Sequence, residues 1–441
     1  MEETLRIILF ILFGIYITVF ILKHPYIGLI LTVSSLPIIE LLPSIPFFNT
    51  ILPLLGAITV VGFLFTLKSG SSVKPISISP VHLFGLLFII WMFITNPQAA
   101  WSGPSRNWTF TFIQLWVLML LSSNLFDTSK KQMALMWIFS IIAIVSAFYA
   151  ITTGNIDVSE ELTRRSRGFT DNANAAARYF TVAMVFLSYL RSVSINPFQR
   201  TITLIGTIIT YVGVFFTVSR TGIVLLFAAQ VILFLFQAKG RQRFWLIFVG
   251  VLGLLIVWLF AASAFQIIET IIPAVAQGSD TMGLRYALWE AGWKMFQDKP
   301  LTGVGIGMFE WVLPYYGQGV EILRNRSIWA HNTYIQILSE TGIIGFLLFM
   351  GMFLSTFSNF IRARFKGAYE NEAKKEIWLI VFIVMLLGGI TKSDHADKLT
   401  WMIMGISALF YNQAQLDAKL GSEPQKNLIN TGNSAGNRLH N

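Results

Sequence analysis

The side chains best suited to chemistry lie in one polar stretch, residues 280–345, of an otherwise apolar chain. Arg285, Trp289, Gly292 and Phe296 are spaced there at helical intervals, so they share one face of a predicted helix. A guanidinium group can bind two phosphate oxygens at once, and the tryptophan beside it can contact a sugar ring. The alternative is an amphipathic helix that rests on the bilayer with its tryptophans among the headgroups.

A histidine follows in the same stretch. His331 and Asn332 precede a short predicted helix at 333–338, with Gly342 in the position just past its end. Nearby arginines lower the proton affinity of an imidazole, and a neutral imidazole is what a general base requires. His331 is therefore a candidate base, and the alternative is a hydrogen-bonding residue at the start of a helix.

Arg220 lies between two apolar runs with almost no loop between them. A charge so close to hydrocarbon usually faces a cavity or a partner, which favours a functional role over the alternative, a structural ion pair. Gly222 would let a ligand or another backbone approach closely.

Two further patterns are weaker. The glycine-rich segment 303–307 lacks the preceding buried strand of a dinucleotide loop, so we predict a flexible turn. Asp394, His395 and Asp397 have metal-like side chains, but their short loop can equally cap the last helices. The chain has no cysteine, and it has no Walker loop, nucleophile elbow or zinc signature, so no metal or other cofactor is predicted.

The composition indicates the scaffold that holds these residues. Hydrophobic residues make up 55% of the chain and charged residues 12%, with a mean hydropathy of +0.66. Apolar runs long enough to cross a bilayer recur along the chain, without the alternation of a membrane β-strand. We predict an all-α polytopic integral membrane protein with about 12–13 transmembrane helices. The thirteen segments are 5–23, 26–42, 50–67, 80–96, 108–124, 134–152, 176–191, 201–218, 221–238, 244–263, 343–361, 377–392 and 399–412.

Most lysines and arginines then fall in short connections on one side, which the positive-inside rule makes cytoplasmic. The net charge of +10 therefore does not indicate nucleic-acid binding. We predict a transmembrane bundle at 1–263, a large extracytoplasmic helical loop at 264–342, C-terminal transmembrane helices at 343–412 and a disordered cytoplasmic tail at 413–441.

Several arginines map to the outer side against this rule: Arg164, Arg165, Arg167, Arg178, Arg220, Arg285, Arg324 and Arg326. Their position predicts an anionic partner, and a phosphorylated membrane-embedded ligand fits best. The alternative is interfacial snorkelling or binding of anionic lipid headgroups.

Together these motifs resemble the O-antigen ligase and O-antigen polymerase family of bacterial membrane glycosyltransferases. The matching segments are RSRGFTDNANAAA at 165–177, VSRTG at 218–222, LRYALWEAGW at 284–293, PLTGVGIGMF at 300–309 and HNTYIQILSETGIIG at 331–345.

The resemblance implies a GT-C-type fold in the bacterial inner membrane, with the active site facing the periplasm or cell exterior. It implies metal-independent, inverting transfer of a glycan from undecaprenyl diphosphate to a glycan, lipid or protein acceptor, as in lipopolysaccharide assembly. The family's diphosphate-binding arginines fall on Arg220 and Arg285, with Arg167 as a third, and its histidine falls on His331. Further substrate contacts are predicted at Arg165, Asn332, Trp289 and Trp293.

Two other functions stay open. A polymerase of lipid-linked repeat units would use the same leaving group, so these residues do not separate it from a ligase. A transporter of an anionic solute would be expected to show two similar halves, and we see no such repeat in the sequence.

Overall fold

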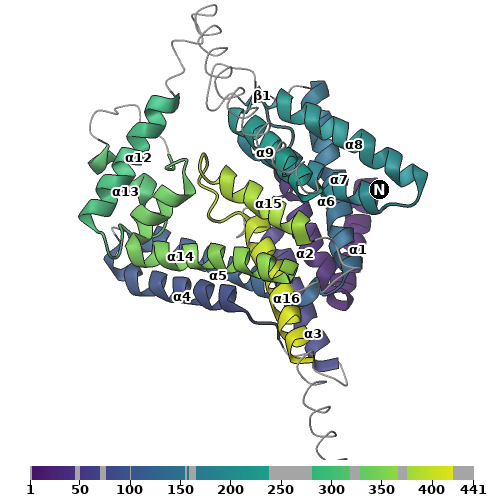
Figure 1. The fold of residues 1–441 in the computed structure, drawn as a ribbon, viewed down its shortest axis with the longest axis horizontal. Coiled ribbons are helices and arrows are strands. Elements are labelled where there is room, and N and C mark those ends of the chain that lie inside the picture. The colour runs from purple at the N-terminus through teal and green to yellow at the C-terminus, as the bar shows by residue number, and fades with distance from the viewer. Residues whose placement is uncertain are drawn as a thin grey trace, which may run out of the picture.

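The computed structural model describes residues 2–44, 50–69, 76–99, 101–153, 156–157, 165–237, 281–317, 328–365 and 375–420. These residues are almost entirely helical (Figure 1). The N-terminal elements are α1 (Glu2–Lys23), α2 (Pro25–Ser34), η1 (Leu36–Leu41), α3 (Leu52–Ser69), α4 (Pro80–Thr95), η2 (Asn96–Gln98), α5 (Ser102–Leu125) and α6 (Ser129–Thr153). The central elements are β1 (Ile156–Asp157), β2 (Arg165–Ser166), α7 (Ala173–Val193), α8 (Pro197–Phe216) and α9 (Arg220–Gln237). The C-terminal elements are α12 (Thr281–Asp298), α13 (Phe309–Tyr316), α14 (Thr333–Phe365), α15 (Lys375–Gly388) and α16 (Lys398–Leu420).

The predicted all-α polytopic membrane fold is confirmed. Every predicted segment coincides with a helix except 244–263, which lies outside the described residues. Within the described part, five helices are long and apolar enough to cross a membrane: Pro80–Gln98, Ser102–Leu125, Ser129–Thr153, Pro197–Phe216 and Thr333–Arg362. Leu52–Leu67 and Arg220–Leu235 are shorter apolar helices, so the predicted count of 12–13 spans stays a prediction.

The first two predicted spans are not simple rods. Gly14–Lys23 and Pro25–Ser34 meet at an angle of 120°. Pro25 provides the reason, because it has no backbone N–H for a continuing helix and sits at the first position of α2. The second span also ends early, since η1 replaces the α-helix from Leu36 onward.

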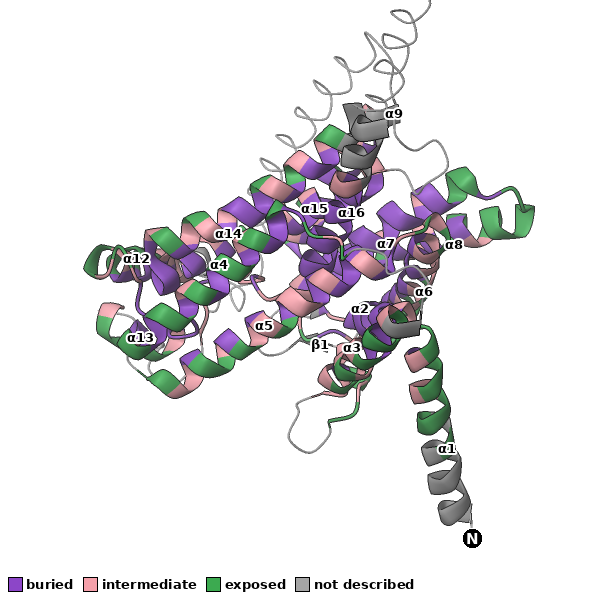
Figure 2. Ribbon diagram, turned by 90° about the horizontal axis from the view of Figure 1, so that it is seen from below, coloured by how far each residue is buried: buried purple, intermediate pink, exposed green. Residues whose placement is uncertain are grey.

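The core lies where α7, α15 and α16 meet, and Figure 2 shows buried residues gathered there. Small residues at the start of α7 let other helices approach closely. Ala177 packs against Gly222 of α9, and the buried ring of Trp378 in α15 lies edge-on to Phe186 of α7, 5.4 Å between ring centroids. α7 is therefore the inner helix on which α6, α8, α9 and α15 assemble.

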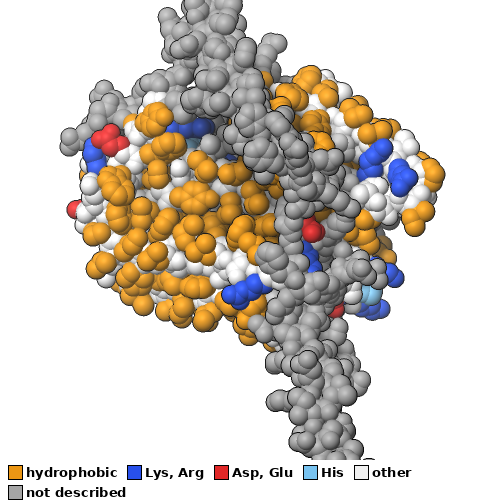
Figure 3. All heavy atoms as spheres, viewed as in Figure 1, with side chains coloured by type: hydrophobic (Ala, Val, Ile, Leu, Met, Phe, Trp, Pro, Cys, Tyr) orange, Lys and Arg blue, Asp and Glu red, His pale blue; other side chains and the backbone are white. Residues whose placement is uncertain are grey.

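The outer face of the helices is apolar. Hydrophobic side chains gather on the described part of the face seen in Figure 3. Exposed apolar side chains include Leu83 and Phe93 of α4, Phe110 of α5, and Leu347 and Leu354 of α14. A soluble protein rarely exposes so large an apolar area, so this face is suited to contact lipid.

Segments predicted to share one side of the membrane contact each other. The rings of Trp108 and Trp329 are 5.1 Å apart between centroids, and those of Trp101 and Trp311 are 5.8 Å apart. α12 and α13 form a small second core with Leu288, Met295, Phe309 and Leu313, which lies beside the start of α14 (Figure 1). The predicted polar stretch is thus a packed helical unit.

Candidate functional site

His331 has an unusual backbone conformation at the start of α14. Its φ is +50°, in the left-handed region that few residues other than glycine adopt. Asn332 then caps the helix, because its side-chain oxygen accepts hydrogen bonds from the backbone N–H groups of Tyr334 (2.9 Å) and Ile335 (3.1 Å). Asn332, which we predicted as a substrate contact, therefore has a structural role. It fixes the start of α14, directly after His331.

The imidazole of His331 is held neutral. Burial, and then the positive charges of Arg285 and Lys392, lower the pKa of His331 to about 4. The expected neutral imidazole near positive charge is therefore supported. Arg285 comes from α12 and Lys392 from the loop between α15 and α16, so two distant parts of the chain act electrostatically on His331.

The predicted Arg285 face of α12 packs against the protein. Trp289 donates a hydrogen bond from its ring nitrogen to the backbone oxygen of Ala330, 3.0 Å away, and Gly292 packs against Ile335 and Phe309. This places Arg285 on the face of α12 turned toward His331, and contact of the same helix with the bilayer stays a prediction. Trp293 is half-exposed and contacts Phe296.

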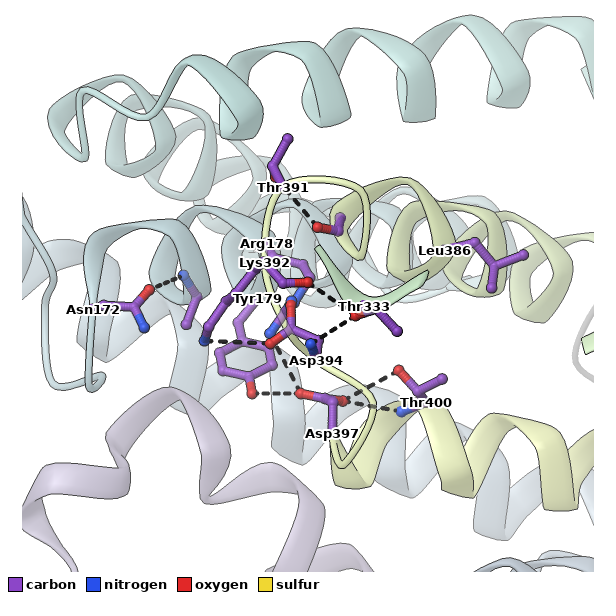
Figure 4. Close-up of polar contacts among 12 residues, drawn as sticks. Asn172, Arg178, Tyr179, Thr333, Leu386, Thr391, Lys392, Asp394, Asp397 and Thr400 are labelled. Carbon is purple, nitrogen blue, oxygen red and sulfur yellow. Dashed lines mark hydrogen bonds and ion pairs between the residues drawn. The ribbon is translucent and has the colours of Figure 1, made fainter. Parts of the chain in front are cut away.

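The loop that follows α15 is bound to the first residue of α14 (Figure 4). The backbone N–H of Thr333 donates to the oxygen of Gly389 (2.8 Å), and its hydroxyl donates to the oxygen of Lys392 (2.9 Å). The same hydroxyl accepts a bond from the backbone N–H of Asp394 (2.8 Å). Thr333 thus holds this loop two residues from His331.

A buried ion cluster lies on the other side of the same loop. Arg178 of α7 is only 2% exposed and pairs with Asp394 and, at 3.4 Å, with Asp397. Asp397 also accepts a hydrogen bond from the Tyr179 hydroxyl (2.8 Å) and caps α16 at the backbone N–H of Thr400 (3.0 Å) (Figure 4). The capping alternative for this acidic loop is confirmed, and the described residues contain no cluster of His, Asp and Glu suited to a metal ion.

Arg220 begins α9 next to this cluster. Ser219 donates a hydrogen bond to the Asn174 side chain of α7 (2.8 Å) and accepts one from the backbone of Gly222 (3.0 Å). Val218 has a φ of +49°, which is strained for a β-branched residue. Among the described residues, the two non-glycine residues with positive φ are Val218 and His331, each at or beside a predicted catalytic residue. Such strain marks functional sites.

The two arginines of the preceding predicted loop are less central. Arg167 forms an ion pair with Glu40 at 2.6 Å and also donates to the backbone oxygen of Asp171 at 3.3 Å. A carboxylate thus already compensates its charge. The side chain of Arg165 lies outside the described residues, although its backbone pairs with Asp157 in the two-stranded ribbon.

The glycine-rich segment is not the flexible turn that we predicted. Val304 and Gly305 donate backbone hydrogen bonds to the oxygens of Ser339 (3.0 Å) and Glu340 (2.9 Å) in α14. The buried Glu340 carboxylate accepts bonds from the backbone N–H groups of Gly307 (2.9 Å) and Phe309 (3.1 Å). The segment is therefore buried and fixed, and it clamps the first two turns of α14.

Glycines make this clamp possible. Gly303 and Gly342 have φ values of +67° and +65°, and a side chain on either would meet the backbone of the other segment, at Glu340 and Leu301. Gly342 has a non-helical backbone and separates two helices within α14, so the predicted short helix that starts at Thr333 and has Gly342 just past its end agrees with the structure.

Sequence reasoning missed Lys392 and Asp171. Their side chains approach to 3.7 Å, and Lys392 also lies 3.4 Å from Asp394. No motif links these residues, because they belong to segments far apart in the sequence. One indication of this region was available in the sequence, because Arg178 and the acidic loop were both predicted on the outer side of the membrane.

The fold and this site define a helical multi-pass membrane protein with a cationic site where its loops meet. Residues 205–350 match the family model described as O-antigen ligase, and they include Arg220, Arg285 and His331. The match supports membership of the chain in the O-antigen ligase and polymerase family, so the resemblance drawn from the motifs is confirmed. No curated protein matches the chain. The matched domain supports a role in surface polysaccharide biosynthesis and a glycosyltransferase-like activity.

Proposed function

We propose that this protein transfers a glycan from undecaprenyl diphosphate to an acceptor at the outer face of the bacterial cytoplasmic membrane, as an O-antigen ligase-like enzyme. The observation that carries the proposal is the position of His331 at the start of α14, under the electrostatic influence of Arg285 and Lys392. A partly buried, neutral base in such surroundings suits a substrate that brings its own negative charge and needs a proton removed.

The proposed reaction is a single displacement. A hydroxyl oxygen of the acceptor attacks the anomeric carbon of the donor glycan and forms the new C–O bond, while the bond from that carbon to the phosphate oxygen breaks. Undecaprenyl diphosphate leaves with the electron pair, and His331 takes the hydroxyl proton. Attack opposite to the leaving group inverts the configuration at the anomeric carbon.

The arginines would act on the leaving group. Negative charge builds on the departing phosphate in the transition state, and fixed guanidinium groups stabilise it without reorganising. Arg285 and Arg220 are the proposed ligands, and Arg167 is a weaker third because it is paired with Glu40. A diphosphate is a good leaving group, so the mechanism requires no metal and no carboxylic acid.

Aromatic residues of the outer unit offer a path for the glycan. Trp101, Tyr315 and Tyr316 line a cavity of about 290 Å³ together with Lys299, Val304 and Val312. Tyr316 is oriented by a hydrogen bond from its hydroxyl to Asp298 at 2.6 Å. We assign these rings, together with the previously predicted Trp289 and Trp293, to the contact with sugar rings.

The test is glycan transfer by purified protein with an undecaprenyl-diphosphate glycan as donor. We expect His331→Ala, Arg285→Ala and Arg220→Ala each to lose at least about 100-fold in activity, the usual cost of removing a base or a transition-state donor. Arg285→Lys should also be impaired, since lysine cannot bind two oxygens in a planar fork. Lys294→Ala is the control, because this lysine lies on the same helix and pairs with the exposed Glu290.

Two results would contradict the proposal. One is full activity of any two of the three alanine variants, in a preparation free of a paralogue. The other is a wild-type protein that does not transfer glycan but moves an anionic solute across vesicles. A deletion strain separates ligase from polymerase: unattached long chains indicate a ligase, and single attached repeats without long chains indicate a polymerase.

A further inference from the structure

A cavity of about 370 Å³ lies where three connecting regions of the N-terminal helices meet. Its walls come from the joint between α1 and α2, from the end of α3 and from the connection between α5 and α6, and they include Lys23, Pro25, Phe63, Leu67, Leu125 and Lys131. The bend of 120° between the helices that end at Lys23 and begin at Pro25 forms one side of this space. The cavity belongs to a part of the protein for which the proposed function has no role.

This cavity and the outer helices α12 and α13 lie at opposite ends of α5. The helix has 24 residues and is therefore about 36 Å long. Trp101, directly before α5, contacts Trp311 of α13 at 5.8 Å between ring centroids, whereas Leu125, its last residue, lines the cavity. The positive-inside rule places Lys23 and Lys131 on the cytoplasmic side, so the cavity is predicted at the cytoplasmic surface of the membrane.

Two lysines give the cavity a positive charge. Lys131 pairs with Asp127 at 2.7 Å, and its ammonium group lies 5.2 Å from the centroid of the Tyr26 ring. Lys23 lies at the exposed end of α1 and forms no ion pair with any residue that the structure describes. The carboxylate of Asp127 is therefore already engaged, and the two lysines exceed it by one positive charge.

The rest of the wall is largely apolar. Phe63 and Leu67 contribute from α3, and Leu125 contributes from α5. The neighbouring side chains Leu64 and Phe65 of α3 are 52% and 57% exposed, so this helix presents an apolar surface beside the cavity that is suited to hydrocarbon. A ligand that complements both the lysines and this wall has an anionic head and an apolar chain.

We propose that this cavity binds an anionic phospholipid of the cytoplasmic leaflet, one with a glycerol-linked phosphodiester such as phosphatidylglycerol. Its phosphate is bound by Lys23 and Lys131, and part of an acyl chain packs against Phe63 and Leu67. Basic pockets between helices on the cytoplasmic side are suited to such headgroups, and a lysine ammonium group serves as a compact charge for the phosphate. The inference does not depend on the proposed function, because the cavity contains none of the proposed catalytic or substrate-binding residues.

The experiment measures how tightly the delipidated full-length protein in detergent binds phosphatidylglycerol, by native mass spectrometry. We expect Lys23→Gln combined with Lys131→Gln to weaken binding of the first lipid about tenfold or more, because two cations near the headgroup are removed. Lys130→Gln is the matched control, since Lys130 is exposed, directly precedes Lys131 in α6 and does not line the cavity. This control should bind the lipid as the wild type does.

A second variant fills the cavity and keeps its charges. Thr66 lines the cavity from α3 and is exposed, so Thr66→Trp adds a ring there without replacing a buried side chain. We expect it to weaken phosphatidylglycerol binding about tenfold as well. Phosphatidylglycerol should also raise the midpoint of thermal unfolding of the wild type and of Lys130→Gln more than that of either cavity variant, because a ligand stabilises the state that binds it.

Phosphatidylcholine and glycerol 3-phosphate identify the source of the phosphate. A clear preference for phosphatidylglycerol over both supports the inference. Equal binding of phosphatidylcholine would overturn it, because the lysines would then not select an anionic head. Binding of glycerol 3-phosphate as tight as that of phosphatidylglycerol would overturn it in favour of a soluble phosphate ester.

The variants decide whether the cavity is the site. Wild-type affinity in the double lysine variant overturns the inference. Weakened binding in the double variant with normal binding by Thr66→Trp also overturns it, because the lysines would then attract lipid only as part of the general surface charge. Glycan transfer is measured on the same preparations, and a wild type that binds phosphatidylglycerol in the cavity but transfers no glycan would overturn the proposed function alone.

Discussion

Two groups of cations lie on either side of the loop between α15 and α16, and they differ in how their charge is compensated. Arg178 is almost fully buried between Asp394 and Asp397 and lies 5.3 Å from the centroid of the Tyr179 ring. Arg285 and Lys392 lie at His331, where their positive charge lowers the pKa of the imidazole. The first group sets one arginine between two aspartates and ties helices together, while the second acts electrostatically on a candidate base. The same residue type therefore has a structural role at one position and a proposed catalytic role at the other.

The comparison predicts its largest effect at Arg178. Arg178→Met removes the buried arginine that pairs with Asp394 and Asp397, and breaking a buried ion pair typically costs about 3–5 kcal/mol. We expect a large loss of folded protein and of thermal stability in detergent, measured by a thermal unfolding scan.

Lys131→Met is the control for this prediction. Its ion pair with Asp127 is at the surface, with both side chains about 30% exposed, so its loss should cost only about 0–1 kcal/mol. If Arg178→Met were as stable as Lys131→Met and merely inactive, the contrast between the two groups of cations would be wrong.

Acid should destabilise the protein next, through one histidine at each group. Burial lowers the pKa of His395 to about 4, and burial with the nearby cations lowers that of His331 to about 4, whereas an unfolded histidine titrates near 6.5. Below about pH 6.5 the unfolded chain therefore binds more protons than the folded one. Stability is fully present above that pH and is lost progressively as the pH falls toward 4.

This prediction is measured as the midpoint of thermal unfolding between pH 7.5 and 4.5. A double variant, His331→Gln with His395→Gln, should show a flatter dependence on pH because neither position can then titrate. Equal slopes in the wild type and the double variant would mean that the acid sensitivity arises elsewhere.

The smallest effect is expected at His395, which borders the Arg178 cluster. Its ring stacks on Phe112 and contacts Trp108 and Trp329, and neither ring nitrogen has a hydrogen-bond partner among the described residues. His395→Phe keeps the stacking and removes buried polar atoms, so we expect unchanged or slightly higher stability and near-normal transfer.

His395→Ala provides the comparison for His395→Phe, because it opens a cavity between the rings and should be clearly less stable. If a stable His395→Phe protein lost transfer activity, His395 would instead take part in the reaction. The Arg178 cluster beside it could then no longer be called purely structural.

Most of the fold could be predicted, because a long apolar run in a membrane has few alternatives to a helix. The positions of α4, α5, α6 and α14 follow from such runs. Local exceptions came from backbone chemistry. Pro25 produced a sharp bend, and the glycine-rich segment at 303–307 became a buried clamp on α14 because the Glu340 carboxylate satisfies its N–H groups.

The site was predicted in part. His331, Arg285 and Arg220 could be named because each belongs to a local motif, and the family match covers all three. Lys392 and Asp171 could not, since neither belongs to a motif and their proximity arises only when the α15–α16 loop folds onto α7 and α14.

The amino-acid sequence by itself determined the membrane class, most helices and the residue types of the site, since hydropathy and motif chemistry are local properties. Only the tertiary structure decided that Arg178 lies between two aspartates while Arg285 acts on the imidazole of His331. Charge compensation depends on distance in space, and the carboxylate of Asp397 that pairs with Arg178 lies 219 residues away along the chain.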